Sequence, residues 1–509
     1  MRGMSCRVSS RKLWFTSAVG AFAALALAGT AWSGSKNGNG NNGIPPSEIR
    51  NDETFFQANA VALPAGSAAL VSFDISWVDP ALRSYYLADR NNKSVDVVST
   101  LTFTASLFNK ASAGGTGPTF VGTRGTLQPG GVDTGVLCGG NGPFVAPCVS
   151  NNNVSGPDGV LTAENSTQLW VGDGNSRVWA LNPTTGAMLT PPAGGSNPVL
   201  TSPASQNNLN RADELCYDPV DHLVMAANNA DSPPFATIIS ATSFKVVAKI
   251  TFDGTNGAPN STNGIEQCAW SPRTGMFTIT VPGIDATGTM GVVAQISPKT
   301  HKVVKVFGPY SINDCAQPQG QAVGPAPQIL LGCNQPSPDG SFNTIIIDEN
   351  NGSVIQTLVG EGGNDEVWFG EDNGTPKSND GHYFLARGQA PTAQFLGIVD
   401  SQFRAQDQSI QTGTPGGTAR RAHSVAADYT SGLVYVPIPA TGGGSGGSLG
   451  FQSALCGSTA ALQAAGCIAV FAPTLPDDQP PPVVVGKNNN GKHNKHKEAR
   501  ERGDDDSQE

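Results

Sequence analysis

Four stretches of this chain share one short pattern: DISWVDP (74–80), DELCYDP (213–219), EQCAWSP (266–272) and HSVAADY (423–429). Each begins with a charged or titratable residue, continues as a half-buried strand and ends in a turn. Further copies in the same register begin at Asp158, Gln319 and Asp365, and neighbouring copies lie about fifty residues apart. Repetition at such a period indicates stacked or radially arranged supersecondary units.

Seven such units fit between residues 51 and 473, and each contains four short strands separated by turns. Four strands joined by short turns form an antiparallel blade, and blades arranged in a ring leave only short, protected strand edges. The high content of glycine (62) and proline (37) agrees with many short strands between turns. We therefore predict an all-β fold, a seven-bladed β-propeller of four-stranded antiparallel blades.

The segments outside the repeats differ in composition from the predicted propeller. Residues 1–31 have a basic front, an apolar stretch at 18–28 and small residues after it, which is typical of a signal peptide. A retained membrane anchor is less favoured, because the apolar run is short and breaks at Gly29. Residues 32–50 form a Gly/Asn-rich linker, and residues 474–509 are Pro-rich and then charged, which predicts disorder. We expect a secreted or periplasmic protein with no membrane span in the mature chain.

Cysteine usage agrees with export. Eight cysteines remain after the predicted signal peptide, and an even number in an exported protein indicates disulfides. A cysteine metal site is less favoured, because the chain contains no Cys-x-x-Cys pair. Short loops favour three pairings and leave a fourth: Cys138–Cys148, Cys315–Cys333, Cys456–Cys467 and Cys216–Cys268.

The repeated polar residues predict a site on the propeller axis, because the innermost strand of each blade lines the central channel. Carboxylates crowded together raise one another's pKa or bind a cation. Oxygen ligands from carboxylates and amides suit calcium. A hydrated polar channel without an ion is the alternative. The predicted ligands are Asp74, Asp158, Asp213, Glu266 and Asp365, with Gln319 and His423 completing the circle.

Short motifs resemble those of known propeller families. The unit at 73–99, with Asp-Pro, a turn, YLAD and then SVDVV, resembles YVTN-type and NHL-type repeats. The GPDG at 156–159 and the turns NPTTG (182–186) and SPKTH (297–301) are similar to those of gluconolactonase, strictosidine synthase and paraoxonase-like propellers. In the lactonase-like propellers a calcium ion in the channel is held by Glu, Asn and Asp from several blades. The resemblance would place Glu266, Asp213, Asp365 and nearby asparagines around such an ion.

Two function classes remain open. The first is a binding or interaction module for an unknown protein or small molecule, favoured by degenerate repeats, long insertions at 102–153 and 440–467, and the lack of a strong catalytic motif. These insertions either cap one mouth of the channel or decorate its rim. The alternative is a calcium-dependent hydrolase of the lactonase or arylesterase class. In that case His423 would be catalytic, and Gln319, Arg420 and Arg421 would bind substrate.

Other classes have less support. A net charge of −10 argues against a nucleic-acid partner, which would favour a basic face. No haem, flavin or nucleotide motif is present, so an oxidoreductase is poorly supported. Five tryptophans lie on predicted strands, and we interpret them as residues that pack between blades rather than as a platform for a sugar ligand. They are Trp77, Trp170, Trp179, Trp270 and Trp368.

Overall fold

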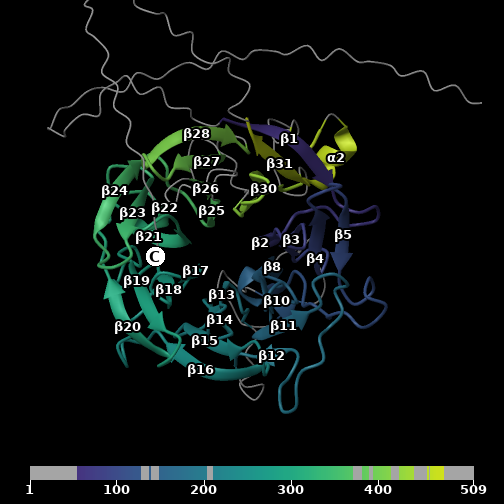
Figure 1. The fold of residues 1–509 in the computed structure, drawn as a ribbon, viewed down its shortest axis with the longest axis horizontal. Coiled ribbons are helices and arrows are strands. Elements are labelled where there is room, and N and C mark those ends of the chain that lie inside the picture. Colours follow the sequence, from purple (N-terminus) through teal and green to yellow (C-terminus); the bar gives the residue numbers. More distant parts are fainter. Residues whose placement is uncertain are drawn as a thin grey trace, which may run out of the picture. The chain divides into compact units, whose positions relative to one another are not determined.

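Seven four-stranded antiparallel sheets are arranged around a central axis and form a β-propeller (Figure 1). This arrangement is seen in a computed structural model of the chain. The structure describes residues 54–127, 137–138, 148–202, 210–370, 381–388, 394–413, 423–440, 455–457 and 459–474. The predicted signal peptide, linker and charged tail lie outside these residues, as do Arg420 and Arg421, so the predictions for them stay predictions.

The first four blades follow each other along the chain. Blade 1 contains β2 (Phe73–Asp79), β3 (Ser84–Asp89), β4 (Ser94–Ser99) and β5 (Ala105–Phe108). Blade 2 contains β9 (Val160–Ala163), β10 (Gln168–Asp173), β11 (Arg177–Leu181) and β12 (Val199–Leu200). Blade 3 contains β13 (Leu215–Asp218), β14 (Leu223–Asn228), β15 (Phe235–Ser240) and β16 (Lys245–Thr251). Blade 4 contains β17 (Cys268–Ser271), β18 (Met276–Val281), β19 (Val292–Ser297) and β20 (Lys302–Phe307).

The remaining blades complete the ring. Blade 5 contains β21 (Ala316–Val323), β22 (Gln328–Gln335), β23 (Asn343–Asp348) and β24 (Val354–Val359). Blade 6 contains β25 (Val367–Gly370), β26 (His382–Arg387), β27 (Phe395–Asp400) and β28 (Ala405–Gln411). Blade 7 contains β29 (Ala426–Asp428), β30 (Leu433–Ile438), β31 (Cys467–Pro473) and β1 (Phe55–Ala62).

The strand sequences match their positions in the blades. The second strand of a blade is covered on both faces by neighbouring blades, so it is mostly apolar, as in β14 with the sequence LVMAAN, whose six residues are all buried. The outermost strand has a solvated face and is mostly exposed, as in β20 with the sequence KVVKVF, of which only Phe307 is buried. Burial of these apolar faces between adjacent blades is the main stabilising contribution to the ring.

The N-terminal strand closes the ring. β1 forms the outer edge of blade 7 and pairs antiparallel with β31, from Phe55 opposite Pro473 to Ala62 opposite Cys467. The ring of Phe55 packs edge-on against Phe384 of blade 6 at 5.4 Å between centroids. Blade 7 therefore does not close with consecutive strands of its own, as the other six blades do. It closes with the strand FFQANAVA from the other end of the chain.

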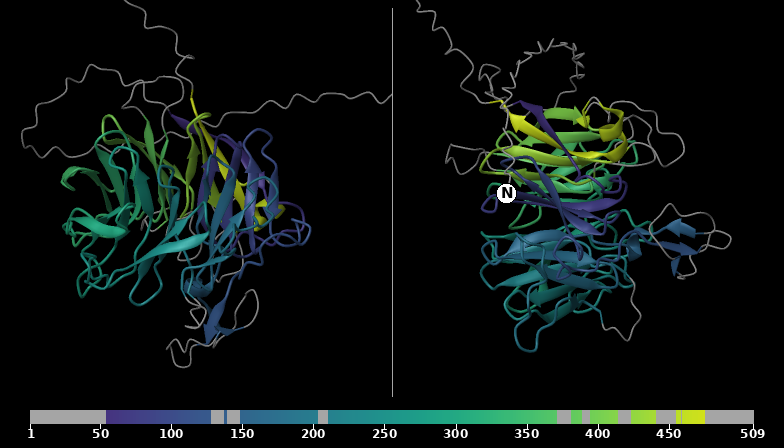
Figure 2. Two further views of the ribbon diagram at one scale, coloured as in Figure 1. Left: turned by 60° about the horizontal axis from the view of Figure 1, so that its bottom comes forward. Right: turned by 90° about the vertical axis from the view of Figure 1, so that its right-hand side faces the viewer.

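The two predicted insertions both contain secondary structure. In the first, β6 (Gly125–Leu127), β7 (Leu137–Cys138) and β8 (Cys148–Ser150) form a small sheet that stands away from the blades (Figure 2). In the second, the helix α2 (Ala460–Ala465) precedes β31. No helix among the described residues is long and apolar enough to cross a membrane.

Three of the four predicted disulfides are present in the structure. Cys216–Cys268 joins the inner strands of blades 3 and 4, with 5.7 Å between its Cα atoms. Cys315–Cys333 lies in blade 5, and Cys456–Cys467 ties the second insertion to β31. Cys148 is disulfide-bonded, but the side chain of Cys138 lies outside the described residues, so their pairing stays a prediction.

Candidate functional site

The repeated register found in the sequence is present in the structure. Six of the seven polar residues stand five positions before the last residue of their inner strand, as Asp213 does before Asp218 and Glu266 before Ser271. Gln319 stands four positions before the end of β21. The other members of the set of six are Asp74, Asp158, Asp365 and His423.

Two arginines neutralise the carboxylates on blades 1 to 3. Asp74, Asp158 and Asp213 bring one oxygen each within 4.8 Å of the others. Arg90, in the turn after β3, donates to Asp74 and, through Nε, to Asp158 Oδ1 at 2.6 Å. Arg211, just before β13, lies 2.6 Å from Asp213 Oδ2 and donates to Asp74 Oδ2 at 3.1 Å. The sequence predicts a calcium ion as the partner of these carboxylates. In the structure their partners are two guanidinium groups.

His423 is hydrogen-bonded to an acid of this network. Its Nε2 is 3.0 Å from Asp74 Oδ1, and its ring stacks on Phe73 at 5.1 Å between centroids. Burial lowers the pKa of His423, and the charges of Arg90 and Arg211 act in the same direction. The imidazole is therefore held in its neutral form near pH 7.

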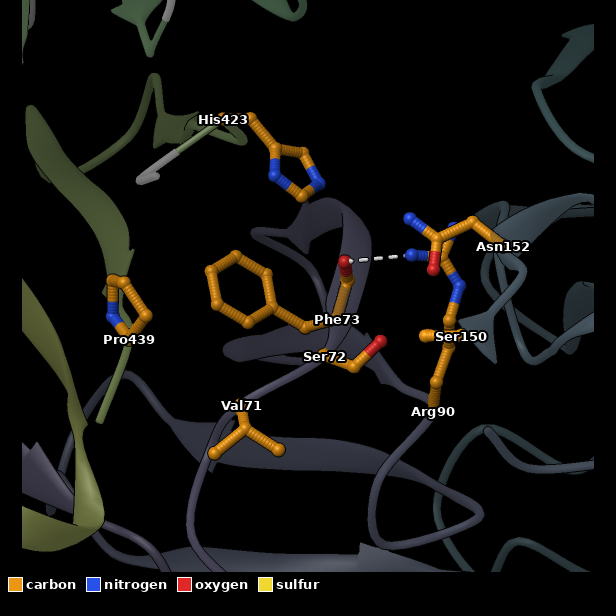
Figure 3. Close-up of a pocket in the computed structure, with 8 residues that line it drawn as sticks. All are labelled: Val71, Ser72, Phe73, Arg90, Ser150, Asn152, His423 and Pro439. Carbon is orange, nitrogen blue, oxygen red and sulfur yellow. Dashed lines mark hydrogen bonds between the residues drawn. The ribbon is translucent and has the colours of Figure 1, made fainter. Parts of the chain in front are cut away.

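His423 lines a cavity of about 250 Å³ at the end of the channel where the inner strands begin. Figure 3 shows the His423 and Phe73 rings on one side of this cavity, with Arg90 donating to the carbonyl of Phe73 at 3.1 Å. Ser150 and Asn152, on the opposite side, belong to the first insertion. This insertion therefore shapes one end of the channel rather than only decorating the rim.

A second group of acids lies on blades 3 to 6. Glu214 and Glu366 each follow a residue of the predicted ring, and their carboxyl groups are hydrogen-bonded to each other. Burial raises the pKa of Glu366 to about 8, and burial and the charge of Glu366 raise that of Glu214. Burial, together with Asp213 and Asp365, raises the pKa of Glu266. The pair Glu214–Glu366 is therefore mainly protonated at neutral pH.

Glutamine side chains fill the channel between blades 4 and 6. Gln267 donates from Nε2 to the carbonyl of Val367 at 3.2 Å, and its Oε1 accepts from the backbone of Gln321 at 2.7 Å. The side chain of Gln321 donates in return to the carbonyl of Gln267 at 2.7 Å. Gln319, the predicted member of blade 5, accepts through its own carbonyl from Thr280 at 2.6 Å. Direct hydrogen bonds thus link blades 4, 5 and 6 at this level of the channel.

Beyond this layer lies a second cavity of about 360 Å³, which we call the aromatic cavity. It is lined by the inner strands of blades 1 to 6 and shares no described lining residue with the His423 cavity. The rings of Trp77 and Trp368 meet edge-on in its wall at 5.0 Å between centroids. The aromatic lining residues are Trp77, Tyr217, Trp270, Trp368 and Phe369.

The tryptophans thus divide into two sets. Trp170 and Trp179 are buried between blades, as the sequence analysis predicts. Trp77, Trp270 and Trp368 are only partly buried and line the aromatic cavity as well as contacting the core. Alternation along a strand does not reveal which face meets a neighbouring blade and which meets the channel, so the sequence carried no signal that separates the two sets.

No protein-family model matches the sequence, and no curated protein matches it. Among solved structures, the crystal structure of the WD40 beta propeller domain of Doa1 matches with a TM-score of 0.46 and 12% identity. The match covers 82% of this chain and 97% of that one. A match at this identity and TM-score carries no argument about function. The resemblance to YVTN, NHL or lactonase-like propellers stays a prediction.

Proposed function

We propose that this protein is a non-catalytic β-propeller that binds a small molecule in the aromatic cavity. The observation that carries the proposal is the cavity itself. Its volume of about 360 Å³ and its aromatic lining, with the polar residues Glu214, Gln267 and Gln321, match the usual composition of small-molecule sites. Such sites are concave, mostly apolar and carry a few polar groups that orient the ligand.

We also propose that the protein is exported. The support is the predicted signal peptide at 1–31 together with three disulfides, which persist in oxidising compartments. Fractionation of expressing cells tests this proposal. We expect the protein outside the cytoplasm with residues near Ala31 as its new N-terminus, whereas an uncleaved cytoplasmic protein would contradict it.

The binding proposal is tested by thermal-shift screening of a small-molecule library against wild type and Ala269→Trp. Ala269 lines the aromatic cavity and is partly exposed, so a tryptophan at this position fills the cavity. We expect compounds that raise the melting temperature of the wild type and leave that of the folded variant unchanged. If no compound binds, or if every compound also stabilises Ala269→Trp, the proposal is wrong.

The second candidate is the calcium-dependent hydrolase. Its one supporting observation is that His423 lines a cavity of about 250 Å³ beside Ser72 and Arg90. The acids do not fit a calcium site on blades 1 to 3, because Asp74, Asp158 and Asp213 already bind arginine. The charge of Arg211 also acts on the two other predicted acid ligands, Glu266 and Asp365.

Metal analysis separates the two candidates. For the binding module we expect dialysed protein to contain less than one calcium per chain and its melting temperature to be unchanged by EDTA. We also expect no turnover of lactones or aryl esters. Stoichiometric calcium, a lower melting temperature in EDTA, and turnover that is lost in His423→Ala would favour the hydrolase instead.

A further inference from the structure

A cluster of one histidine and two aspartates lies on blade 6. His382 begins β26, Asp400 ends β27 and Asp407 is the third residue of β28. One ligand atom from each of the three lies within 4.8 Å of the other two. None of them is among the described residues that line the His423 cavity or the aromatic cavity, so the proposed function does not use them.

The spacing of these atoms suits a small divalent cation. His382 Nε2 is 3.2 Å from Asp407 Oδ2. Two ligand atoms of a tetrahedral zinc ion lie about 3.3 Å apart, because each is about 2.1 Å from the metal. The Asp400 oxygen is at most 4.8 Å from the other two atoms, so a shift of about 1.5 Å or less completes the set.

Burial makes a cation favourable at this place. The side chains of His382 and Asp407 are 5% and 2% exposed, and Asp400 is 8% exposed. Burial and the charge of Asp407 raise the pKa of Asp400, since two carboxylates close together repel each other. A divalent ion between them removes this repulsion, and zinc accepts both imidazole nitrogen and carboxylate oxygen as ligands.

The blade fold does not require this set of residues. The strand register aligns blade 6 with blade 3, where the equivalent positions carry no histidine and no acid. The residues there are Leu223, Ser240 and Val247. Val247 is 43% exposed, whereas Asp407 places a carboxylate at the same position and buries it. A requirement of blade 6 itself, rather than of the propeller, therefore brings the three side chains together.

The cluster lies against the strand that closes the ring. The side chain of Phe55, the first residue of β1, packs edge-on against the imidazole of His382 at 5.5 Å between centroids. Gln408, the neighbour of Asp407, accepts from the backbone N–H of Phe55 at 2.8 Å and donates to its carbonyl at 2.9 Å. A group that fixes His382 and Asp407 therefore also fixes the start of β1, which lies next to β28 (Figure 1).

We propose that His382, Asp400 and Asp407 bind a zinc ion, which holds β1 against blade 6 and thereby stabilises ring closure. Three protein ligands leave the fourth tetrahedral position to water. The rings of Phe55 and Phe384 beside His382 orient the imidazole and form an apolar shell at the site. The alternative is a hydrogen-bonded network of the same three residues that binds no ion. This site is separate from the aromatic cavity, so its failure and that of the proposed function are independent.

Titration with zinc chloride tests the site. The C-terminal segment contains His493 and His496, which are also zinc-ligating residues, so the reference protein is the full chain with His493→Ala/His496→Ala. We expect a site with three protein ligands to release its ion on dialysis. EDTA should therefore leave the melting temperature of the dialysed reference protein unchanged, and added zinc should raise it. Isothermal titration should give one zinc per chain, and a reference protein that binds no stoichiometric zinc would overturn the inference.

Two variants of the reference protein test the ligands. His382→Gln removes the imidazole, and Asp400→Asn removes one carboxylate but keeps an acceptor for the backbone N–H of Phe403. Each should weaken zinc binding by at least about tenfold, and circular dichroism checks that each is folded. His301→Gln, which removes a partly exposed histidine from the turn before β20, serves as the control and should bind zinc like the reference. If the first two variants also bind like the reference, the inference is wrong.

Hydrogen exchange tests the link to ring closure and needs no variant of the three ligands. Saturating zinc should slow the exchange of backbone amides in β1 by at least about tenfold, because the ion stabilises the state in which Phe55 is docked. The outer strand β20, two blades away from the cluster, serves as the control and should exchange at the same rate with and without zinc. If zinc binds but leaves β1 exchanging at its metal-free rate, the proposed role in ring closure is wrong.

Discussion

Arg211 is the residue on which the charge balance of blades 1 to 3 depends. Its guanidinium group lies within 3.6 Å of carboxylate oxygens from three different blades, on Asp74, Asp158 and Asp213. Asp213 and Asp158, together with Glu266 and Asp365, raise the pKa of Arg211 despite its burial, so it remains charged at any pH at which the protein folds. A single side chain from an interblade segment therefore links three inner strands.

Replacement of Arg211 by methionine should destabilise the fold strongly. The change leaves buried carboxylates with one cation fewer, and breaking a buried pair by removing one partner costs about 3–5 kcal/mol. Urea denaturation at pH 7 measures the free energy of unfolding. Lys302→Met, which removes an exposed cation from β20, should change it by less than about 0.5 kcal/mol. A loss below about 1 kcal/mol for Arg211→Met would contradict the structural role given to this arginine.

At the same scale, the sequence identifies the acids but not their counterions. Asp158, Asp213 and Glu266 are found because they recur at one register position. Arg90 and Arg211 belong to no repeat, since each occurs once and reaches the axis from a turn or a linker. The length of the arginine side chain allows each of them to contact carboxylates of more than one blade. The spacing of residues along the sequence does not predict such contacts.

At the scale of elements, the Cys216–Cys268 disulfide links the first strands of two blades. It joins β13 to β17 and lies in the wall of the aromatic cavity. The sequence predicts the pairing only by elimination, whereas the structure shows why it forms: the two residues occupy adjacent inner strands. The bond therefore ties blade 3 to blade 4 where the two blades approach the axis most closely.

Removal of this disulfide should cost more stability than removal of Cys456–Cys467. The two bonds close loops of 52 and 11 residues, and loop entropy alone gives about 4 and about 3 kcal/mol respectively. Thermal and urea unfolding of Cys216→Ala/Cys268→Ala and of Cys456→Ala/Cys467→Ala provide the comparison. The reverse order of stabilities would show that strain or residual structure outweighs the loop term.

At the scale of the whole molecule, several buried acids have raised pKa values and no arginine or lysine among the causes of the shift. Outside the channel, burial raises the pKa of Asp89 to about 6 and that of Asp173 to about 7. Burial and the charge of Asp89 also raise the pKa of Asp96. The folded state therefore holds protons at pH values at which the unfolded chain has released them.

The free energy of unfolding should consequently fall as the pH rises from about 4 to about 7. A carboxyl group whose pKa is higher in the folded state than in the unfolded chain stabilises the fold at pH values below its unfolded-state pKa. This stabilisation is lost as the pH rises through the folded-state pKa, at up to about 1.4 kcal/mol per pH unit for each proton. Urea denaturation at pH 5 and pH 8 measures the difference. Asp96→Asn, which is neutral at both, should reduce it. Higher stability at pH 8 than at pH 5 would contradict the prediction.

The fold could be predicted from the sequence more completely than the candidate site. The number of blades and their strands follow from the recurrence of one unit and from alternating apolar residues, because both are local properties. Ring closure by residues 55–62 and the aromatic cavity depend instead on which distant strands become neighbours. Those relations arise only when the ring is assembled.

The pairing of β1 with β31 has a consequence for how the protein is made. The outermost strand of blade 7 is synthesised before the first six blades, and its partner, residues 467–473, is synthesised after them. A nascent chain can form the blades in between, but β1 stays unpaired until β31 has been made. Blade 7 can therefore be completed only after residues 467–473 have been synthesised.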